Sequence, residues 1–316
     1  GGNECSTYAG QTFPGALTSI LGESSAAGEG SQAPSRHALE AEAMAQALSE
    51  VDSTFCRRYD VLGLCGSTAL IALLKFDPKA EGSGEESVPT LIMGNVGDSR
   101  AVACVGGTAV PLTVDAKPTR PDEVARVVDR GGFVVGGRVG GQLAVTRSLG
   151  DRDLKSMGQA FITCWPEASA LSLEPRVEFV LLACDGLWDV MSNQAAVDTA
   201  RKCLTTLRMP PEQAAQRLVD DAIDKLGSKD NVSVLLIVKG TGAAAAEARR
   251  DLKIEEPDSL DLDLELGLGF GGLGLGSGGR EESPPPRPPP AVDGRDKPIE
   301  DDEELMEFLM DDANFT

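Results

Sequence analysis

Hydrophobic and polar positions along residues 1–240 switch repeatedly between a helical period and a strand period. Met44, Leu48, Val51 and Phe55 recur every three or four residues and predict an amphipathic helix over residues 36–58. Similar patterns predict helices over residues 121–130, 193–207 and 211–226. Apolar runs predict strands over residues 69–76, 90–104, 108–113, 177–184 and 231–238, with a hairpin turn at 105–107. Strands mixed with paired helices, without a regular β-α-β alternation, favour an α+β fold.

The pattern stops near Gly240, where the composition changes. Residues 241–316 carry 20 acidic and 7 basic side chains, so they hold -13 of the formal net charge of -21. They also contain a Gly/Leu tract at 267–279 and a proline run at 284–290. Such segments bury too little apolar surface to offset the loss of chain entropy. We therefore predict a folded domain over residues 1–240 and a disordered acidic, Gly/Pro-rich tail over 241–316.

Charge and cysteine content narrow the function classes. A pI near 4.4 argues against a nucleic-acid binder, which needs clustered Lys and Arg. The seven cysteines show no C-x-x-C spacing, which favours free thiols in a reducing compartment, cytoplasmic or nuclear. The longest aliphatic run, residues 69–74, is far below the roughly 20 residues of a membrane span. The single histidine, His37, begins the first predicted helix, where we expect a solvated surface residue.

Short acidic segments border the predicted strands. Asp115, Asp185 and Asp230 each lie beside small residues at a strand end, and Asp98 lies within a strand pair. Carboxylates in such positions can bind hard divalent cations through oxygen. An aspartate at a strand end can equally serve as a cap or turn residue, and spacing alone leaves both roles open.

Five segments, taken together and in order, resemble the metal-dependent Ser/Thr protein phosphatases of the PPM or type 2C family. They are GSTA at 66–69, GNVGDSRA at 94–101, LAVTRSLGD at 143–151, DGLWD at 185–189 and GSKDNV at 227–232. The resemblance implies a four-layer α-β-β-α sandwich, in which two antiparallel sheets are flanked by helices. It also implies metal-dependent hydrolysis of phosphoserine and phosphothreonine in protein substrates.

The resemblance assigns roles to individual positions. Asp185 and Asp230 match ligands of the family's two-metal Mg²⁺ or Mn²⁺ centre. Asp115 matches an aspartate implicated in a third metal site, although Ala116 replaces the histidine that follows it in the family. By contrast, we expect structural ion pairs in the sheet core from a further set of matching residues, namely Asp98, Arg100, Arg147 and Asp151.

Family motifs that supply a phosphate-binding Arg, a metal-bridging Asp and a general-acid His would precede residue 1. The opening Gly1-Gly2 matches the last two residues of the family's Asp-Gly-His-Gly-Gly segment. We therefore expect the chain to lack the N-terminal strands, to hold no catalytic residue of its own, and to be an inactive fragment of an active parent. His37 cannot replace the missing histidine. The alternative is a pseudophosphatase that acts as a scaffold or regulatory binding protein.

Three tail segments could bind partners of an otherwise monomeric protein. Leu260–Leu266 alternates leucine with acid, which suits a strand added to a partner's sheet edge or a solvated linker. Residues 283–290 favour polyproline II, either as a ligand for an SH3 or WW-type groove or as a stiff spacer. Residues 305–310 could form a short partner-binding helix or fray as a terminus.

Overall fold

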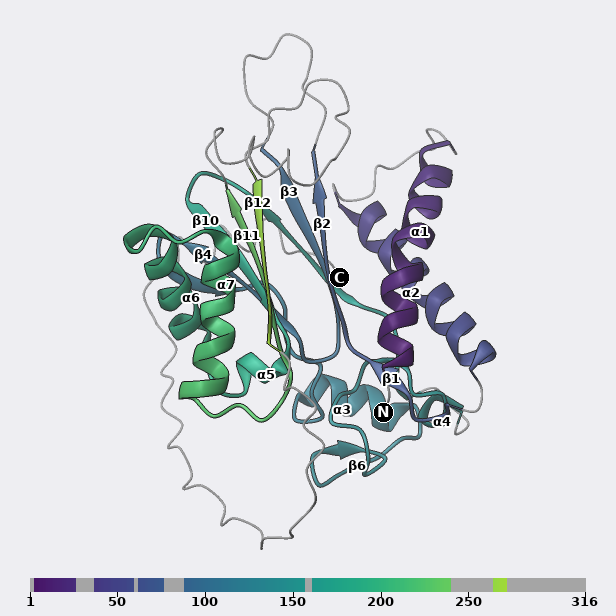
Figure 1. Cartoon of the computed structure of the whole chain (residues 1–316). Helices are drawn as coiled ribbons and strands as arrows, with labels where there is room; N and C mark the ends of the chain where they lie inside the picture. Colours follow the sequence, from purple (N-terminus) through teal and green to yellow (C-terminus); the bar gives the residue numbers. More distant parts are fainter. Residues whose placement is uncertain are drawn as a thin grey trace, which may run out of the picture. The chain divides into compact units, whose positions relative to one another are not determined.

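The computed structural model describes residues 3–26, 37–59, 62–76, 88–156, 161–239 and, for its backbone, 264–271. These residues form a four-layer α-β-β-α sandwich (Figure 1), which confirms the predicted fold class. The compact unit runs from Gly1 to Gly271. It thus includes one strand from the segment that the sequence assigned to the tail. The domain boundary at residue 240 stays a prediction.

Two antiparallel sheets form the inner layers. The first has the spatial order β12 (Leu264–Gly271), β11 (Val232–Lys239), β10 (Val177–Ala183), β4 (Arg100–Val105) and β5 (Thr108–Pro111). The second has the order β2 (Ala69–Lys75), β3 (Thr90–Val96) and β9 (Glu167–Ser172). Two small ladders join β1 (Gly66–Ser67) to β8 (Leu149–Gly150) and β6 (Val134–Val135) to β7 (Arg138–Val139).

Helices form the outer layers (Figure 1). The second sheet is covered by α1 (Glu4–Ala26) and α2 (Ala38–Arg58), and the first by α6 (Asn193–Arg201) and α7 (Pro211–Asp220). Both α6 and α7 continue as π-helical segments, at Lys202–Thr206 and Asp221–Lys225. The remaining helices are α3 (Pro121–Asp129), α4 (Arg152–Ser156) and α5 (Asp185–Trp188). Helix starts follow local chemistry: the Ser192 hydroxyl accepts from the Ala195 N–H, and a proline opens both α3 and α7.

Most predicted elements are confirmed. The predicted helices over 36–58 and 121–130 are α2 and α3, and the strands over 69–76, 108–113, 177–184 and 231–238 are β2, β5, β10 and β11. The hairpin between β4 and β5 turns at Gly106 and Gly107, whose φ angles of 56° and 88° suit glycine. The Gly-, Ser- and Pro-containing stretch at residues 22–34 also predicts a surface loop, and this is wrong for residues 22–26, because α1 extends to Ala26.

The apolar run at residues 90–104 was read as one strand, and this was wrong. Gly97, with φ of 113°, and the following Asp98 and Ser99 divide it into β3 and β4. These two strands belong to different sheets. The chain therefore passes from one sheet to the other at this point. Asp98 lies just before the start of β4, where it becomes part of the site described below.

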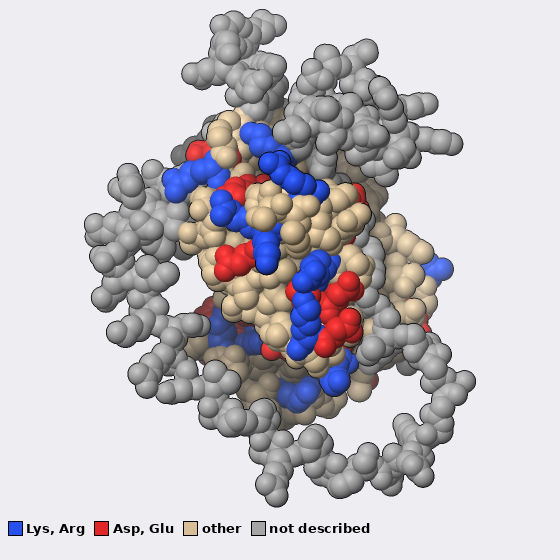
Figure 2. Space-filling model, turned by 60° about the vertical axis from the view of Figure 1, so that its left-hand side comes forward, with Lys and Arg blue, Asp and Glu red and all other residues tan. Residues whose placement is uncertain are grey.

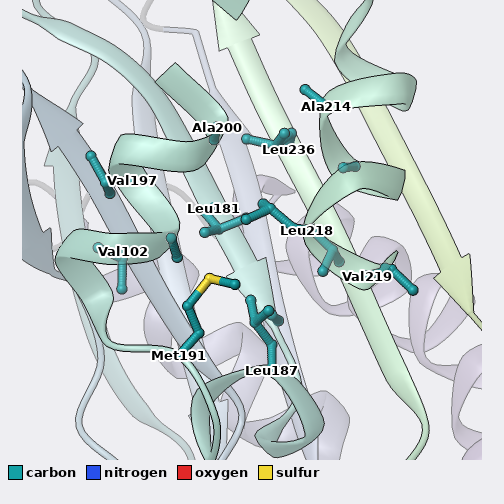
Figure 3. Packing of buried hydrophobic residues seen from close by; sticks show 14 of the residues in the cluster. Val102, Leu181, Leu187, Met191, Val197, Ala200, Ala214, Leu218, Val219 and Leu236 are labelled. Carbon is teal, nitrogen blue, oxygen red and sulfur yellow. The ribbon is translucent and has the colours of Figure 1, made fainter. Parts of the chain in front are cut away.

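The core of the first sheet lies between its strands and helices α6 and α7 (Figure 3). Val102 of β4, Leu181 of β10 and Leu236 of β11 contribute from the sheet, and each is fully buried. Small side chains on the helices, such as Ala200 and Ala214, let them approach the strands closely. This packing fixes the relative positions of β4, β10 and β11, which carry the site.

The surface over α6 and α7 mixes both charge signs (Figure 2). Arg201 pairs with Glu178, and Arg217 pairs with Asp221, each at 2.7 Å. All seven cysteines are free thiols, as the sequence predicted. Among the helices of the described ranges, none has both the length and the apolar character needed to cross a membrane.

Candidate metal centre

The candidate site lies at one end of the first sheet, where three neighbouring strands each begin or end close to an aspartate. Among the described residues, the oxygens of these three aspartates do not all lie within 4.8 Å of one another. In the antiparallel register Ala183 of β10 pairs with Arg100 of β4 on one side and with Val234 of β11 on the other. Asp98 precedes β4, Asp185 follows β10 and Asp230 precedes β11. Because adjacent strands alternate in direction, all three aspartates lie at the same end of the sheet.

Close backbone packing holds the Asp185 and Asp230 loops against each other. A Cβ at Gly186 would lie 2.3 Å from the carbonyl oxygen of Asn231, so only glycine fits there. The Ser228 hydroxyl donates to the Gly186 carbonyl at 2.8 Å. The Cys184 thiol donates to the Asn231 carbonyl at 3.2 Å. These contacts position the two aspartates without using their carboxylates.

Burial and neighbouring negative charge raise the pKa values of Asp98 and Asp185. Burial, together with the neighbouring charge of Asp185, raises the pKa of Asp98 to about 6. Burial and the charge of Asp230 raise the pKa of Asp185 as well. Negative charge is therefore concentrated at a partly buried position, and a bound divalent cation would reduce the repulsion between the carboxylates.

Asp115, the third predicted ligand, is bound by an arginine. Arg100 donates to both of its carboxylate oxygens, at 2.9 and 2.8 Å. The same guanidinium lies 5.3 Å from the ring of Trp188 and donates to Asn193. This pairing is the structural role expected of Arg100. Because the guanidinium already neutralises the carboxylate of Asp115, this carboxylate is less available to a cation than those of Asp185 and Asp230.

Lys117 places an ammonium among the acidic groups. Its Nζ lies 3.2 Å from Asp189, 3.8 Å from Asp115 and 3.9 Å from Asp98. The sequence indicates no role for Lys117 or Asp189, and it predicts a structural role for Asp98. The spacing of Asp185 and Asp189 was an available signal, because residues four apart lie on one face of a helical turn.

A second acidic cluster has a different character. Within the described ranges, Asp122, Glu123 and Glu167 are carboxylates close enough to share an ion, with oxygens within 4.8 Å of one another. However, arginines already bind them: Arg147 pairs with Glu123 at 2.7 Å and with Glu167 at 3.0 Å. Arg120 donates to Glu167 and Asp122, and Arg126 to Glu123.

Glu123 shows the effect of these arginines. It is 2% exposed, and burial alone would raise its pKa. Hydrogen bonds from Arg126, Arg147 and Thr146 nevertheless hold that pKa well below its usual range. We read this cluster as a structural network that ties α3 to β9, in keeping with the structural role expected of Arg147.

One placement was wrong. His37, expected at the solvated surface, is 9% exposed and precedes α2. The residue lies at the start of a helix, as predicted, but its side chain is buried and not exposed to solvent. It lies on a different element from every aspartate of the candidate site.

Comparison with known proteins identifies the family of this chain. A family model described as "Protein phosphatase 2C" matches residues 1–232. The chain belongs to the protein phosphatase 2C family. The match covers all of the acidic segments at the sheet edge, including Asp98, Asp185 and Asp230.

Plant members of the family are among the similar sequences. "Probable protein phosphatase 2C 45" of Oryza sativa subsp. japonica is 38% identical over 198 residues, which is 62% of each chain. "Probable protein phosphatase 2C 59" of Arabidopsis thaliana is 38% identical over 199 residues, 62% of this chain and 57% of that protein. The chain thus spans about three fifths of the length of these curated relatives.

Solved structures share the fold. The structure titled "Structure of a C.elegans sex determining protein" superposes with a TM-score of 0.59 at 27% identity, covering 75% of this chain and 53% of that one. A phosphatase from a pathogenic strain of Toxoplasma gondii superposes with a TM-score of 0.57 at 22% identity, covering 74% and 80%.

Proposed function

We propose that this chain is the larger part of a metal-dependent protein Ser/Thr phosphatase. The reaction would be hydrolysis of phosphoserine and phosphothreonine in protein substrates. The observation that carries the proposal is the convergence of Asp98, Asp185 and Asp230 from three adjacent strands on one sheet edge. Membership of the phosphatase 2C family supports the same reaction.

The residues present fit a hard divalent cation. The donor set consists of carboxylate oxygens, which Mg²⁺ and Mn²⁺ prefer. Asp185 and Asp230 would hold the ions of the two-metal centre, as the sequence predicted. When bound, such a pair of ions activates a water molecule and neutralises charge on the phosphoryl group.

Other side chains at the edge would tune the site. Asp98 adds a third carboxylate, whose raised pKa reflects its burial and the nearness of Asp185. A third ion at Asp115 remains part of the proposal. It would have to compete with the guanidinium of Arg100 and the ammonium of Lys117. We therefore expect that ion to bind more weakly than the other two.

Turnover tests the proposal directly. On the full-length protein with a phosphothreonine peptide and Mn²⁺, Asp185→Asn should lower the rate at least about 10²-fold, because a charged metal ligand is lost. Asp220→Asn, at an exposed position on α7, is the matched control and should leave the rate unchanged. Equal rates for Asp185→Asn and wild type would refute the assignment.

The second candidate is a pseudophosphatase that binds phosphoproteins without turning them over. Lys117 favours it, because this ammonium already neutralises part of the charge of Asp98 and Asp189. A scaffold of this kind would bind a phosphopeptide but would show no Mn²⁺-dependent turnover. The tail segments at 260–266, 283–290 and 305–310 stay predicted partner sites. A monomeric state and a cytoplasmic or nuclear location also stay predictions.

A further inference from the structure

The ladder between β10 and β11 ends at Cys184, where a side chain takes the place of a carbonyl. The Cys184 N–H donates to the carbonyl oxygen of Ser233 at 3.3 Å, as expected for the pair that follows Ala183 and Val234. In a regular ladder the Ser233 N–H would return a bond to the Cys184 carbonyl. It donates to the Cys184 thiol instead, at 3.2 Å. Cys184 thus continues the ladder with its side chain.

The turn after β10 explains why the thiol is needed. Cys184 precedes α5, and its carbonyl accepts from the Leu187 N–H at 3.1 Å. Because this carbonyl is used by the helical turn, the thiol gives the Ser233 N–H its partner on the β10 side. Asp185 is the first residue of α5. The change of direction that requires the thiol is therefore the same one that carries Asp185 out of the sheet.

The thiol also donates a hydrogen bond, and its acceptor adjoins Asp230. The Cys184 thiol donates to the carbonyl oxygen of Asn231 at 3.2 Å. The N–H of Asn231 in turn donates to the Asp230 carboxylate at 2.7 Å. A single backbone residue thus connects the thiol to the carboxylate. The same carbonyl oxygen lies against Gly186, where a Cβ would be 2.3 Å away, so Asn231 is confined from two sides.

Ser228 makes the reciprocal contact. Its hydroxyl donates to the carbonyl of Gly186, the residue after Asp185, at 2.8 Å. Ser228 is 7% exposed, so this hydrogen bond is shielded from water. In both contacts, a side chain near one aspartate holds the residue that follows the other aspartate. The two segments therefore fix each other.

We propose that Cys184 and Ser228 are positioning residues of the metal centre, which set the separation of the Asp185 and Asp230 carboxylates. In this role neither side chain binds an ion, and each acts through the backbone beside the opposite aspartate. The side chain at position 184 must donate and accept at once, which a thiol or a hydroxyl can do and a methyl group cannot. The inference rests on the proposed function, because the separation matters only if the aspartates hold cations.

Mn²⁺ binding to the 316-residue chain, measured by titration calorimetry, tests this role. Cys184→Ala should weaken binding roughly 10-fold or more, as is typical when a group that orients a metal ligand is lost. Ser228→Ala should weaken binding in the same way. Cys184→Ser keeps both a donor and an acceptor, so it should restore near-wild-type affinity.

Cys203→Ala is the matched control. Cys203 is also a buried thiol, and it packs in the core between the first sheet and its helices. Its loss should lower the free energy of unfolding in urea but leave Mn²⁺ affinity unchanged. If Cys184 had only a structural role, Cys184→Ala would behave in the same way as this control.

A readout without metal completes the experiment. In residue-resolved hydrogen exchange in EDTA, the Ser233 amide should be protected in wild type and in Cys184→Ser, and should exchange faster in Cys184→Ala. The Leu181 amide of β10 should stay protected in all three proteins.

Several outcomes would overturn the positioning role alone. They are Mn²⁺ affinity that either alanine variant leaves unchanged, equal losses in Cys184→Ser and Cys184→Ala, and an unprotected Ser233 amide in wild type. Wild type that binds no Mn²⁺ would instead refute the proposed metal centre, and the positioning role with it.

Discussion

At the scale of single residues, Asp98 carries much of the electrostatic character of the site. It is 6% exposed, and its pKa is raised to about 6 by burial and by Asp185. A folded-state pKa above the unfolded value means that the folded protein binds more protons between about pH 4 and 6. Ionisation of Asp98 therefore lowers the free energy of unfolding as the pH rises through this window.

The substitution Asp98→Asn should remove this decrease in the free energy of unfolding. In EDTA, the variant should gain stability relative to wild type as the pH rises from about 4 to 6, and the difference should then stay constant. Urea unfolding at several pH values measures this difference in stability.

Asp122→Asn should show the opposite sign. Arg120 lowers the pKa of Asp122 to about 2, so this variant should lose stability relative to wild type as the pH rises from about 2 to 4. No pH dependence of the Asp98→Asn difference would contradict the account.

Lys117 makes a second residue-scale prediction. Its ammonium lies within 3.9 Å of Asp98, Asp115 and Asp189. Lys117→Met removes this charge, so Mn²⁺ should bind the 316-residue chain more tightly, by roughly tenfold, as about 1.4 kcal/mol of charge compensation is lost. Lys117→Arg, which keeps the charge, is the control. Weaker Mn²⁺ binding to the methionine variant, measured by titration calorimetry, would show that Lys117 supports the metal instead of competing with it.

At the scale of elements, the turn after β10 decides whether the site can form. Gly186 lies against the backbone before β11. Gly186→Ala should destabilise the fold by about 1–3 kcal/mol, because the clash involves backbone that cannot move without shifting the strand. Gly10→Ala is the control: a Cβ there meets nothing within 4 Å in α1, so this change should add about 0.5–1 kcal/mol. Thermal unfolding of both variants measures the difference; equal stability of Gly186→Ala and wild type would disprove the close approach.

Most long elements were predictable because their apolar residues either recur with a helical period or form a continuous run. The helical period of α2 and the apolar runs of β2, β10 and β11 can be read directly from short stretches of the sequence. The division of residues 90–104 into β3 and β4 was not predictable from hydrophobicity, because it depends on which sheet each half joins. Strand β9 (Glu167–Ser172) was missed because it is only partly buried and carries little apolar signal.

The site was predicted in part for the same reason. Asp185 and Asp230 were singled out as metal ligands by their motifs. The structure places both at the same end of the first sheet, and their role as ligands stays a prediction. The ligand-like position of Asp98 and the pairing of Asp115 with Arg100 depend on strands that are distant in sequence. The burial of His37 likewise depends on tertiary packing, which the start of a helix does not reveal.

At the scale of the whole molecule, the tail is the main difference from the sequence-based picture. Composition predicts that deleting 241–316 changes thermal stability by only a few degrees. The structure instead pairs residues 264–271 with β11. The segments at 240–263 and 272–316, including the predicted sites at 283–290 and 305–310, lie outside the described residues.

Truncated chains distinguish a disordered tail from a tail whose residues 264–271 pair with β11. A chain ending at residue 271 should melt within a few degrees of the full chain, whereas one ending at residue 240 should melt about ten degrees lower or more, since it loses a whole paired strand. The chain that ends at 240 should also aggregate faster, because the β11 edge is exposed. Equal melting temperatures for the two truncations would support the composition-based view.

The central claim is that Asp98, Asp185 and Asp230 form a divalent-cation site at the edge of the first sheet. The most direct measurement is Mn²⁺ binding to the 316-residue chain by titration calorimetry, with Asp185→Asn and Asp220→Asn compared alongside wild type. We predict saturable binding to wild type and Asp220→Asn, weakened at least about tenfold in Asp185→Asn, since a charged ligand is lost. Absent binding to wild type, or equal affinity in all three proteins, would contradict the account.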